Sequence, residues 1–191
     1  MVSVRCGSNG CSVCLPLNAW GVVLAVTMAR PENKIRLTMD TSDPAQVIAG
    51  MARLRRWWRR YVGPWQDVYA IEANPGANGL HLHGWQYGSP VDQGHLEQAA
   101  EVAGFLGSPY GMPRRLRDGV PLRYPLKGAL YPPGLTMPPH AETFLALNNP
   151  IVHNTRGFWR EWNGQPVGTL RSAARLARTR TASGSWVATT I

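Results

Sequence analysis

Apolar and polar residues alternate in three stretches of the chain, and each stretch predicts a β-strand. Residues 34–40 place isoleucine, leucine and methionine at every second position. Successive side chains of a strand point to opposite faces, so this alternation is typical of a strand with one buried face. Trp65–Ala73 alternates in the same way, with Tyr69 and Ile71 on one face and Glu72 on the other.

The third stretch, Leu80–Trp85, follows the second after a loop of turn-forming residues. This loop predicts that the two strands pair as an antiparallel hairpin. The two leucines of the third stretch share one face, and His81, His83 and Trp85 share the other. If the apolar faces of the two strands match, Glu72 emerges on the same open face as His81 and His83.

Helical spacing predicts a long helix that begins after Asp43. Asp43 is a good N-cap, Pro44 suits the first helical position, and Gln46 completes a capping box. We expect the helix to end at Gly63-Pro64. The predicted core stripe is Val47, Met51, Leu54, Trp58 and Tyr61. Much of the remaining surface is arginine, which forms either a solvated face or a set of phosphate contacts.

The other segments give weaker patterns. Asp92–Leu106 predicts a second helix, and Ala141–Leu147 predicts a short one. The stripe of the second helix is Leu96, Ala99, Ala103 and Leu106. We expect at most one short strand in residues 107–122 and a last edge strand in residues 150–156. Residues 16–30 are apolar, and their periodicity does not separate a strand from a buried helix.

Glu72, His81 and His83 are candidate metal ligands. Imidazole nitrogens and a carboxylate on an open face form a three-ligand site of the catalytic kind, with room for water and substrate. With phosphate oxygens as further ligands, Mg²⁺ or Mn²⁺ is the expected ion, and manganese tolerates imidazole better. The alternative is a pair of hydrogen-bonded strand histidines beside a surface glutamate.

Tyr124 and Lys127 are candidate catalytic residues. A phenol ionises near pH 10, so a nucleophilic tyrosine needs a nearby cation or metal. Lys127 lies one helical turn after Tyr124 and can share its face, if a helix begins with Pro125 at its first position. The alternative is a core tyrosine with a surface lysine, and Tyr131 is a rival nucleophile.

The net charge of the chain indicates which class of binding partner to expect. The chain carries 20 Lys and Arg against 11 Asp and Glu, a net charge of +9. Arginine dominates the cations, and its guanidinium suits bidentate phosphate contacts. This balance favours nucleic acid first and acidic membranes second.

Three cysteines lie near the N-terminus, at Cys6, Cys11 and Cys14. An odd, tight cluster argues against a disulfide framework and for a reduced compartment such as the cytoplasm. A structural Zn²⁺ site would need a fourth ligand from elsewhere, and thiols that bind no metal are the alternative. The apolar run Trp20–Met28 weakly resembles a secretory signal, and it is too short to span a bilayer.

In their order along the chain, these motifs resemble the HUH endonucleases, and specifically the single-tyrosine rolling-circle replication initiators of small single-stranded DNA phages and plasmids. Residues 80–85 (Leu-His-Leu-His-Gly-Trp) resemble the metal motif, and residues 123–127 (Arg-Tyr-Pro-Leu-Lys) the tyrosine motif. Residues 34–40 stand where the family has a threonine-containing strand. The N-terminal cysteines and residues 154–159 (Asn-Thr-Arg-Gly-Phe-Trp) resemble further initiator segments.

The resemblance implies metal-assisted nicking of single-stranded DNA at an origin. Tyr124 would form a 5′-phosphotyrosyl intermediate, and the reverse step would rejoin strands. The expected DNA contacts are Arg36, Thr38, Arg123 and Arg156. No Gly-x-x-x-x-Gly-Lys-Ser/Thr loop is present, so a host helicase and polymerase are expected partners. No membrane partner is expected, and the sequence leaves the oligomeric state open.

Three alternatives remain at this point. A transposase or relaxase would use the same residues on a different DNA. A metal-dependent nuclease that uses water would keep the metal site without needing Tyr124. A non-catalytic basic DNA-binding module would need only the arginines.

The fold class that we predict is α+β. The expectation is an antiparallel sheet of about five strands, with two helices behind it and the metal site on the open face. The resemblance implies the same architecture, which is RRM-like. The predicted organisation is a cysteine-bearing extension (1–30), an endonuclease domain (31–163) and a basic, partly disordered tail (164–191).

Overall fold

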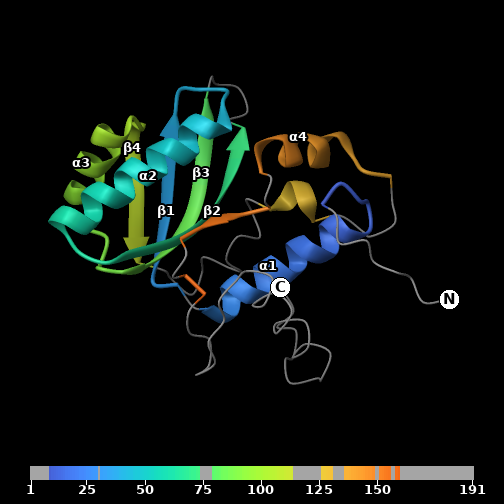
Figure 1. Cartoon of the computed structure of the whole chain (residues 1–191), viewed down its shortest axis with the longest axis horizontal. Coiled ribbons are helices and arrows are strands. Elements are labelled where there is room, and N and C mark those ends of the chain that lie inside the picture. Colours follow the sequence, from blue (N-terminus) through green and yellow to red (C-terminus); the bar gives the residue numbers. More distant parts are fainter. Residues whose placement is uncertain are drawn as a thin grey trace.

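A computed structural model describes residues 9–29, 31–73, 79–113, 126–130, 136–148, 151–155 and 158–159. Its elements, in chain order, are α1 (Cys14–Ala29), β1 (Asn33–Met39), α2 (Pro44–Tyr61), β2 (Trp65–Ala73), β3 (Leu80–Gly88), α3 (Gln93–Ala103), β4 (Leu106–Pro113), the 3₁₀ helix η2 (Lys127–Ala129), α4 (Pro139–Leu147) and β5 (His153–Asn154). Figure 1 shows α2 crossing one face of the sheet, with α3 beside it.

The strands form an antiparallel sheet in the order β4-β1-β3-β2-β5. Four strands have seven to nine residues, and the two-residue β5 pairs with the edge of β2. β2 and β3 are the predicted hairpin partners, and β1 lies on the other side of β3. The α+β class and the antiparallel sheet are confirmed.

The layer formed by α2 and α3 covers one face of the sheet. Tyr69 and Ile71 of β2 and Leu80 and Leu82 of β3 are buried in this core, as their alternation predicted. Val47, Met51, Leu54 and Trp58 form the buried stripe of α2. Tyr61 does not belong to the buried stripe, contrary to the prediction: its side chain is 60% exposed, because it lies in the last turn beyond the edge of the core.

The predicted N-cap of α2 is confirmed, whereas its capping box and the predicted end of the second helix need correction. The Asp43 carboxylate accepts from the Ala45 N–H at 2.8 Å, so Asp43 is the N-cap of α2. The Asp43 N–H donates to Thr41 Oγ1 at 3.0 Å, so threonine, rather than Gln46, satisfies this group. α3 ends at Gly104, whose φ of 82° is left-handed, and Leu106 is therefore an exposed residue of β4 instead of a core residue of the helix.

A second core lies on the opposite face of the sheet. The apolar run 16–30 resolves into the helix α1, which packs with η2 and α4 over Val68, Ala70 and Trp85. We expected Trp85 on the open face beside the histidines, but it is 4% exposed. Its cross-strand partner is the buried Val68, and α1 closes over both. The open face is thus limited to the end of the sheet that carries His81 and His83.

Within the described ranges, no helix is both long and apolar enough to cross a membrane. The division into extension, domain and tail stays a prediction. Residues 164–191 and the loop 114–122 lie outside the described residues. The predicted helix around Pro125 is represented, where the structure describes it, by the 3₁₀ turn η2.

Candidate metal and phosphate site

The pairing register builds one polar row across the sheet. Thr38 of β1 and Glu72 of β2 both lie directly opposite His81 of β3. Arg36 lies opposite His83 in the next row on the same face. Arg36, Thr38, His81 and His83 alternate with buried residues, so their side chains point away from α2 and α3. Glu72 is paired directly with His81 and therefore shares its face.

Glu72 is the centre of the polar contacts. Its Oε2 lies 3.1 Å from His83 Nε2, and its Oε1 lies 2.6 Å from Lys127 Nζ. Burial raises the pKa of the Glu72 carboxyl, but the bonds from His83 and Lys127 outweigh it and bring the pKa below its ordinary value. Glu72 is therefore an ionised carboxylate at neutral pH.

η2 places Lys127 at this site. Leu126, directly before Lys127, and Ala129, two residues after it, are fully buried in the second core and anchor the turn. Gly128 lies against α4, where a Cβ atom would come within 2.8 Å of Phe144 Cβ. A glycine is therefore required for η2 to pack this closely, and the packing directs the neighbouring lysine toward β2.

His81 is held by β1. Its Nδ1 shares a hydrogen bond of 2.8 Å with Thr38 Oγ1. Burial lowers the pKa of His81, the nearby His83 and Arg36 lower it further, and Glu72 opposes them. In the tautomer whose Nδ1–H donates to Thr38 Oγ1, the neutral ring presents an unprotonated Nε2 as a metal ligand, and the hydrogen bond to the hydroxyl fixes the ring orientation.

The side chains of Glu72, His81 and His83 are chemically suitable ligands for a divalent cation, although they are not arranged around a single point where one ion would bind. Two imidazoles and a carboxylate suit Mn²⁺ or Mg²⁺ with substrate oxygens. Within the described residues, no group of three His, Cys, Asp or Glu side chains is placed to hold a metal ion. The ring centroids of His81 and His83 are 6.2 Å apart, and Glu72 is bound by His83 and Lys127.

A pocket of about 430 Å³ opens beside Glu72 and Lys127. β2, η2 and α4 line it, with His140 and Thr143 of α4 among its polar groups and Phe144 and Leu147 among its apolar ones. No sequence motif predicted this pocket. It is formed by segments far apart in the chain, and no local pattern signals their approach.

Several predicted site residues lie outside the described residues: Cys6, Arg123, Tyr124, Tyr131 and Arg156. Arg36 is exposed on the open face, where it was expected. Thr38 was predicted to contact DNA, and the structure adds that it binds His81. Cys11 is half-buried and Cys14 is buried at the start of α1, and a zinc site that includes them stays a prediction.

Comparison of the chain with protein-family models, with curated proteins and with solved structures finds no match.

Proposed function

We propose that this protein nicks and rejoins single-stranded DNA through a tyrosine nucleophile, as a replication initiator. The observation that supports this most directly is the 2.6 Å contact between Lys127 Nζ and Glu72 Oε1. It joins the Tyr-x-x-Lys segment to the strand pair that carries Glu72, His81 and His83. Lys127 and Glu72 are 55 positions apart in the sequence, and this contact brings them together.

In the proposed reaction, the Tyr124 oxygen attacks the scissile phosphorus. The new bond joins phosphorus to the tyrosine oxygen, the bond to the 3′ oxygen breaks, and that oxygen takes up a proton to become a free hydroxyl. The phenol proton passes to solvent. Attack by the 3′ hydroxyl on the phosphotyrosyl bond reverses these steps and joins the strands, so the covalent link conserves the energy of cleavage.

The described side chains have distinct roles in this proposal. Glu72, His81 and His83 would hold Mn²⁺ or Mg²⁺, and the ion would supply Lewis-acid stabilisation of charge on the phosphate. Thr38 orients the His81 ring. Lys127 offsets negative charge beside Glu72, and Arg36 contacts the backbone of the bound strand.

The test is a denaturing gel that detects a protein–DNA adduct. Labelled single-stranded DNA covering both strands of the replicon that encodes the chain is incubated with the protein, in Mn²⁺ or in EDTA. The variants Tyr124→Phe, Tyr131→Phe and His81→Ala are run beside it. We expect a slow band that requires metal, His81 and Tyr124, and that persists in Tyr131→Phe.

Other results would each overturn part of the proposal. Cleavage without an adduct that survives Tyr124→Phe would indicate a nuclease that uses water. An adduct lost only in Tyr131→Phe would move the nucleophile. Binding of DNA with neither cleavage nor adduct would contradict enzymatic activity and indicate a basic DNA-binding module. Nicking of DNA ends that belong to a mobile element, instead of a replication origin, would indicate a transposase or relaxase.

A further inference from the structure

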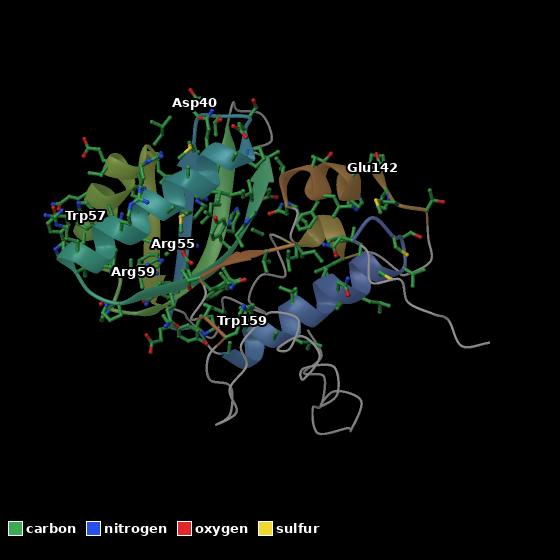
Figure 2. All side chains as sticks on the ribbon, viewed as in Figure 1. Asp40, Arg55, Trp57, Arg59, Glu142 and Trp159 are labelled. Atoms are coloured by element: carbon green, nitrogen blue, oxygen red, sulfur yellow. The ribbon has the colours of Figure 1, made fainter. Side chains whose placement is uncertain are left out.

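α2 carries a concentration of positive charge that the proposed reaction does not use. The helix contains five arginines and no aspartate or glutamate. Arg55 points toward the sheet and pairs with Asp67, whereas four other arginines are exposed: Arg53, Arg56, Arg59 and Arg60. We call these four the arginine face. Figure 2 shows Arg59 and Trp57 at the C-terminal end of α2.

Helix stability accounts for only part of this arrangement. Arg59 and Arg60 lie in the last turn, where positively charged side chains stabilise the helix by interacting with the negative end of its dipole. Arg53 donates to the Ala103 carbonyl and Arg59 to the Trp65 carbonyl. However, Arg56 and Arg60 are four residues apart on one exposed side, and like charges at this spacing destabilise a helix. A function in binding an anion explains why that spacing is present.

Aromatic side chains border the arginine face on the α3 side. Tyr61 is 60% exposed, its ring lies 5.1 Å from that of Trp57, and the Arg60 guanidinium lies 5.4 Å from the Tyr61 ring centre. Exposed aromatic surface beside arginine is typical of nucleic-acid contacts. The acidic residues of the neighbouring helix α3 are Glu97 and Glu101, both exposed, whereas α2 has none.

The arginine face lies behind the sheet, on the side opposite His81 and His83. A single strand bound at the proposed nicking site therefore does not also cover it. α2 is convex and exposed, and its arginines span about 10 Å along the helix axis. A convex helix suits the major groove or the phosphate rows of a duplex, whereas single strands prefer grooves lined with several stacking aromatics.

We propose that the arginine face binds the phosphate backbone of double-stranded DNA, as a second DNA contact separate from the nicking site. The charge is complementary to closely spaced phosphates, and arginine can bind each of them through two N–H groups. This contact would let the protein hold duplex DNA while its opposite face acts on a single strand.

The experiment measures binding of a labelled duplex in EDTA as a function of salt. The test variant is Arg56→Gln/Arg60→Gln, and Arg56→Lys/Arg60→Lys keeps the charge. Arg171→Gln/Arg175→Gln makes the same change in net charge elsewhere in the chain. We expect the glutamine pair on α2 to weaken duplex binding about tenfold per lost contact at low salt and to lower the slope of log K against log salt by about two. The lysine pair should retain most of the slope.

Three outcomes would overturn the proposal. The tail variant Arg171→Gln/Arg175→Gln could lose as much affinity for the duplex as the α2 variant, which would mean that binding depends on net charge alone. The α2 variant could lose more affinity for single-stranded than for duplex DNA, which would place the single strand on this face. Wild-type protein could bind vesicles containing phosphatidylserine but no duplex. Because the binding assay uses neither metal nor Tyr124, its result is independent of whether the chain nicks DNA.

Discussion

At the scale of single residues, the buried charge of Asp67 has a complete set of partners. The side chain is fully buried, and it accepts hydrogen bonds from Arg55 Nε at 3.0 Å, Arg55 Nη2 at 2.6 Å and Trp65 Nε1 at 2.9 Å. Burial lowers the pKa of Arg55, but Asp67 outweighs it, and the net pKa lies above its ordinary value. This ion pair ties α2 to β2.

Arg55→Leu should lower the free energy of unfolding by about 3–5 kcal/mol, because it leaves the Asp67 carboxylate buried without its cation. Urea denaturation measures this loss. The matched control is Arg56→Leu, whose arginine is exposed on the same helix and whose loss should cost within about 0.5 kcal/mol. Equal effects of the two variants would contradict a structural role for the Arg55–Asp67 pair.

His153 should make the protein less stable in mild acid. Its ring stacks on Tyr69 with 5.1 Å between centroids, and among the described residues its buried Nε2 has no hydrogen-bond partner. Burial lowers its pKa, Arg55 lowers it further, and Asp67 opposes them. The unfolded chain, with a histidine pKa near 6.5, therefore binds the proton more readily, and stability falls as the pH drops below about 6.5.

The measurement for His153 is the free energy of unfolding between pH 7 and pH 5, in the wild type and in His153→Phe. Phenylalanine keeps an aromatic ring on Tyr69 and cannot take up a proton. We expect a shallower loss of stability in the variant. Parallel curves for the two proteins would show that His153 does not contribute to the pH dependence.

At the scale of elements, the register between β1 and β3 decides how His81 is oriented. Thr38 lies opposite His81 only in this register, and a shift of β1 by one residue would send the Thr38 side chain to the other face. Thr38→Val removes the hydroxyl and keeps the shape. If the proposed metal site is correct, the affinity for Mn²⁺, measured by calorimetry, should fall about 10–100-fold.

Thr38→Ser is the matched control for the metal-binding prediction, because serine keeps the hydroxyl that binds His81. It should retain most of the affinity for Mn²⁺. Unchanged binding in Thr38→Val would contradict the orienting role that we assign to this hydroxyl.

α4 is joined to the edge of β2 through one buried side chain. Asn148 Oδ1 accepts from the Ile71 N–H, and Asn148 Nδ2 donates to the Ile71 carbonyl, both at 2.7 Å. The side chain thus satisfies the edge of β2 as a neighbouring strand would. Asn148→Ala should destabilise the protein by about 2–4 kcal/mol, because it leaves two buried backbone groups without partners.

Hydrogen exchange at the Ile71 amide measures the loss at Asn148 locally, and we expect faster exchange in Asn148→Ala. The exposed Ala146→Ser, on the same helix, serves as a control with little expected change. Unchanged protection of Ile71 would mean that α4 is held to the sheet by other contacts.

At the scale of the whole molecule, helices cover both faces of the sheet, but the face that carries His81 and His83 is covered only over part of its length. The helices α2 and α3 cover one face, and α1 with η2 and α4 covers the other around Trp85. Trp85→Ala should therefore cost about 3–5 kcal/mol in urea denaturation, as expected for a large side chain lost from a core. Trp20→Ala is the control: its indole is 41% exposed on α1, and its loss should cost below about 1 kcal/mol.

Local sequence patterns were sufficient to predict much of the secondary structure and which face of the sheet many residues occupy. Alternation determined which residues of β1, β2 and β3 face α2 and α3, because the two-residue period of a strand is a property of the backbone itself. The same alternation places Thr38, Glu72, His81 and His83 on the face opposite those helices. The residues of the candidate site could therefore be predicted from the sequence. The N-cap at Asp43 and most of the α2 stripe follow from equally local rules.

Only the tertiary structure decided the rest, because it depends on contacts between distant segments. A strand period cannot say which part of a polar face another helix will cover, so Trp85 became buried while His81 stayed half-exposed. The approach of Lys127 to Glu72 requires η2 to be anchored in the second core. The pairing of Arg55 with Asp67 likewise depends on how α2 packs on β2, and it separates this arginine from the exposed ones beside it.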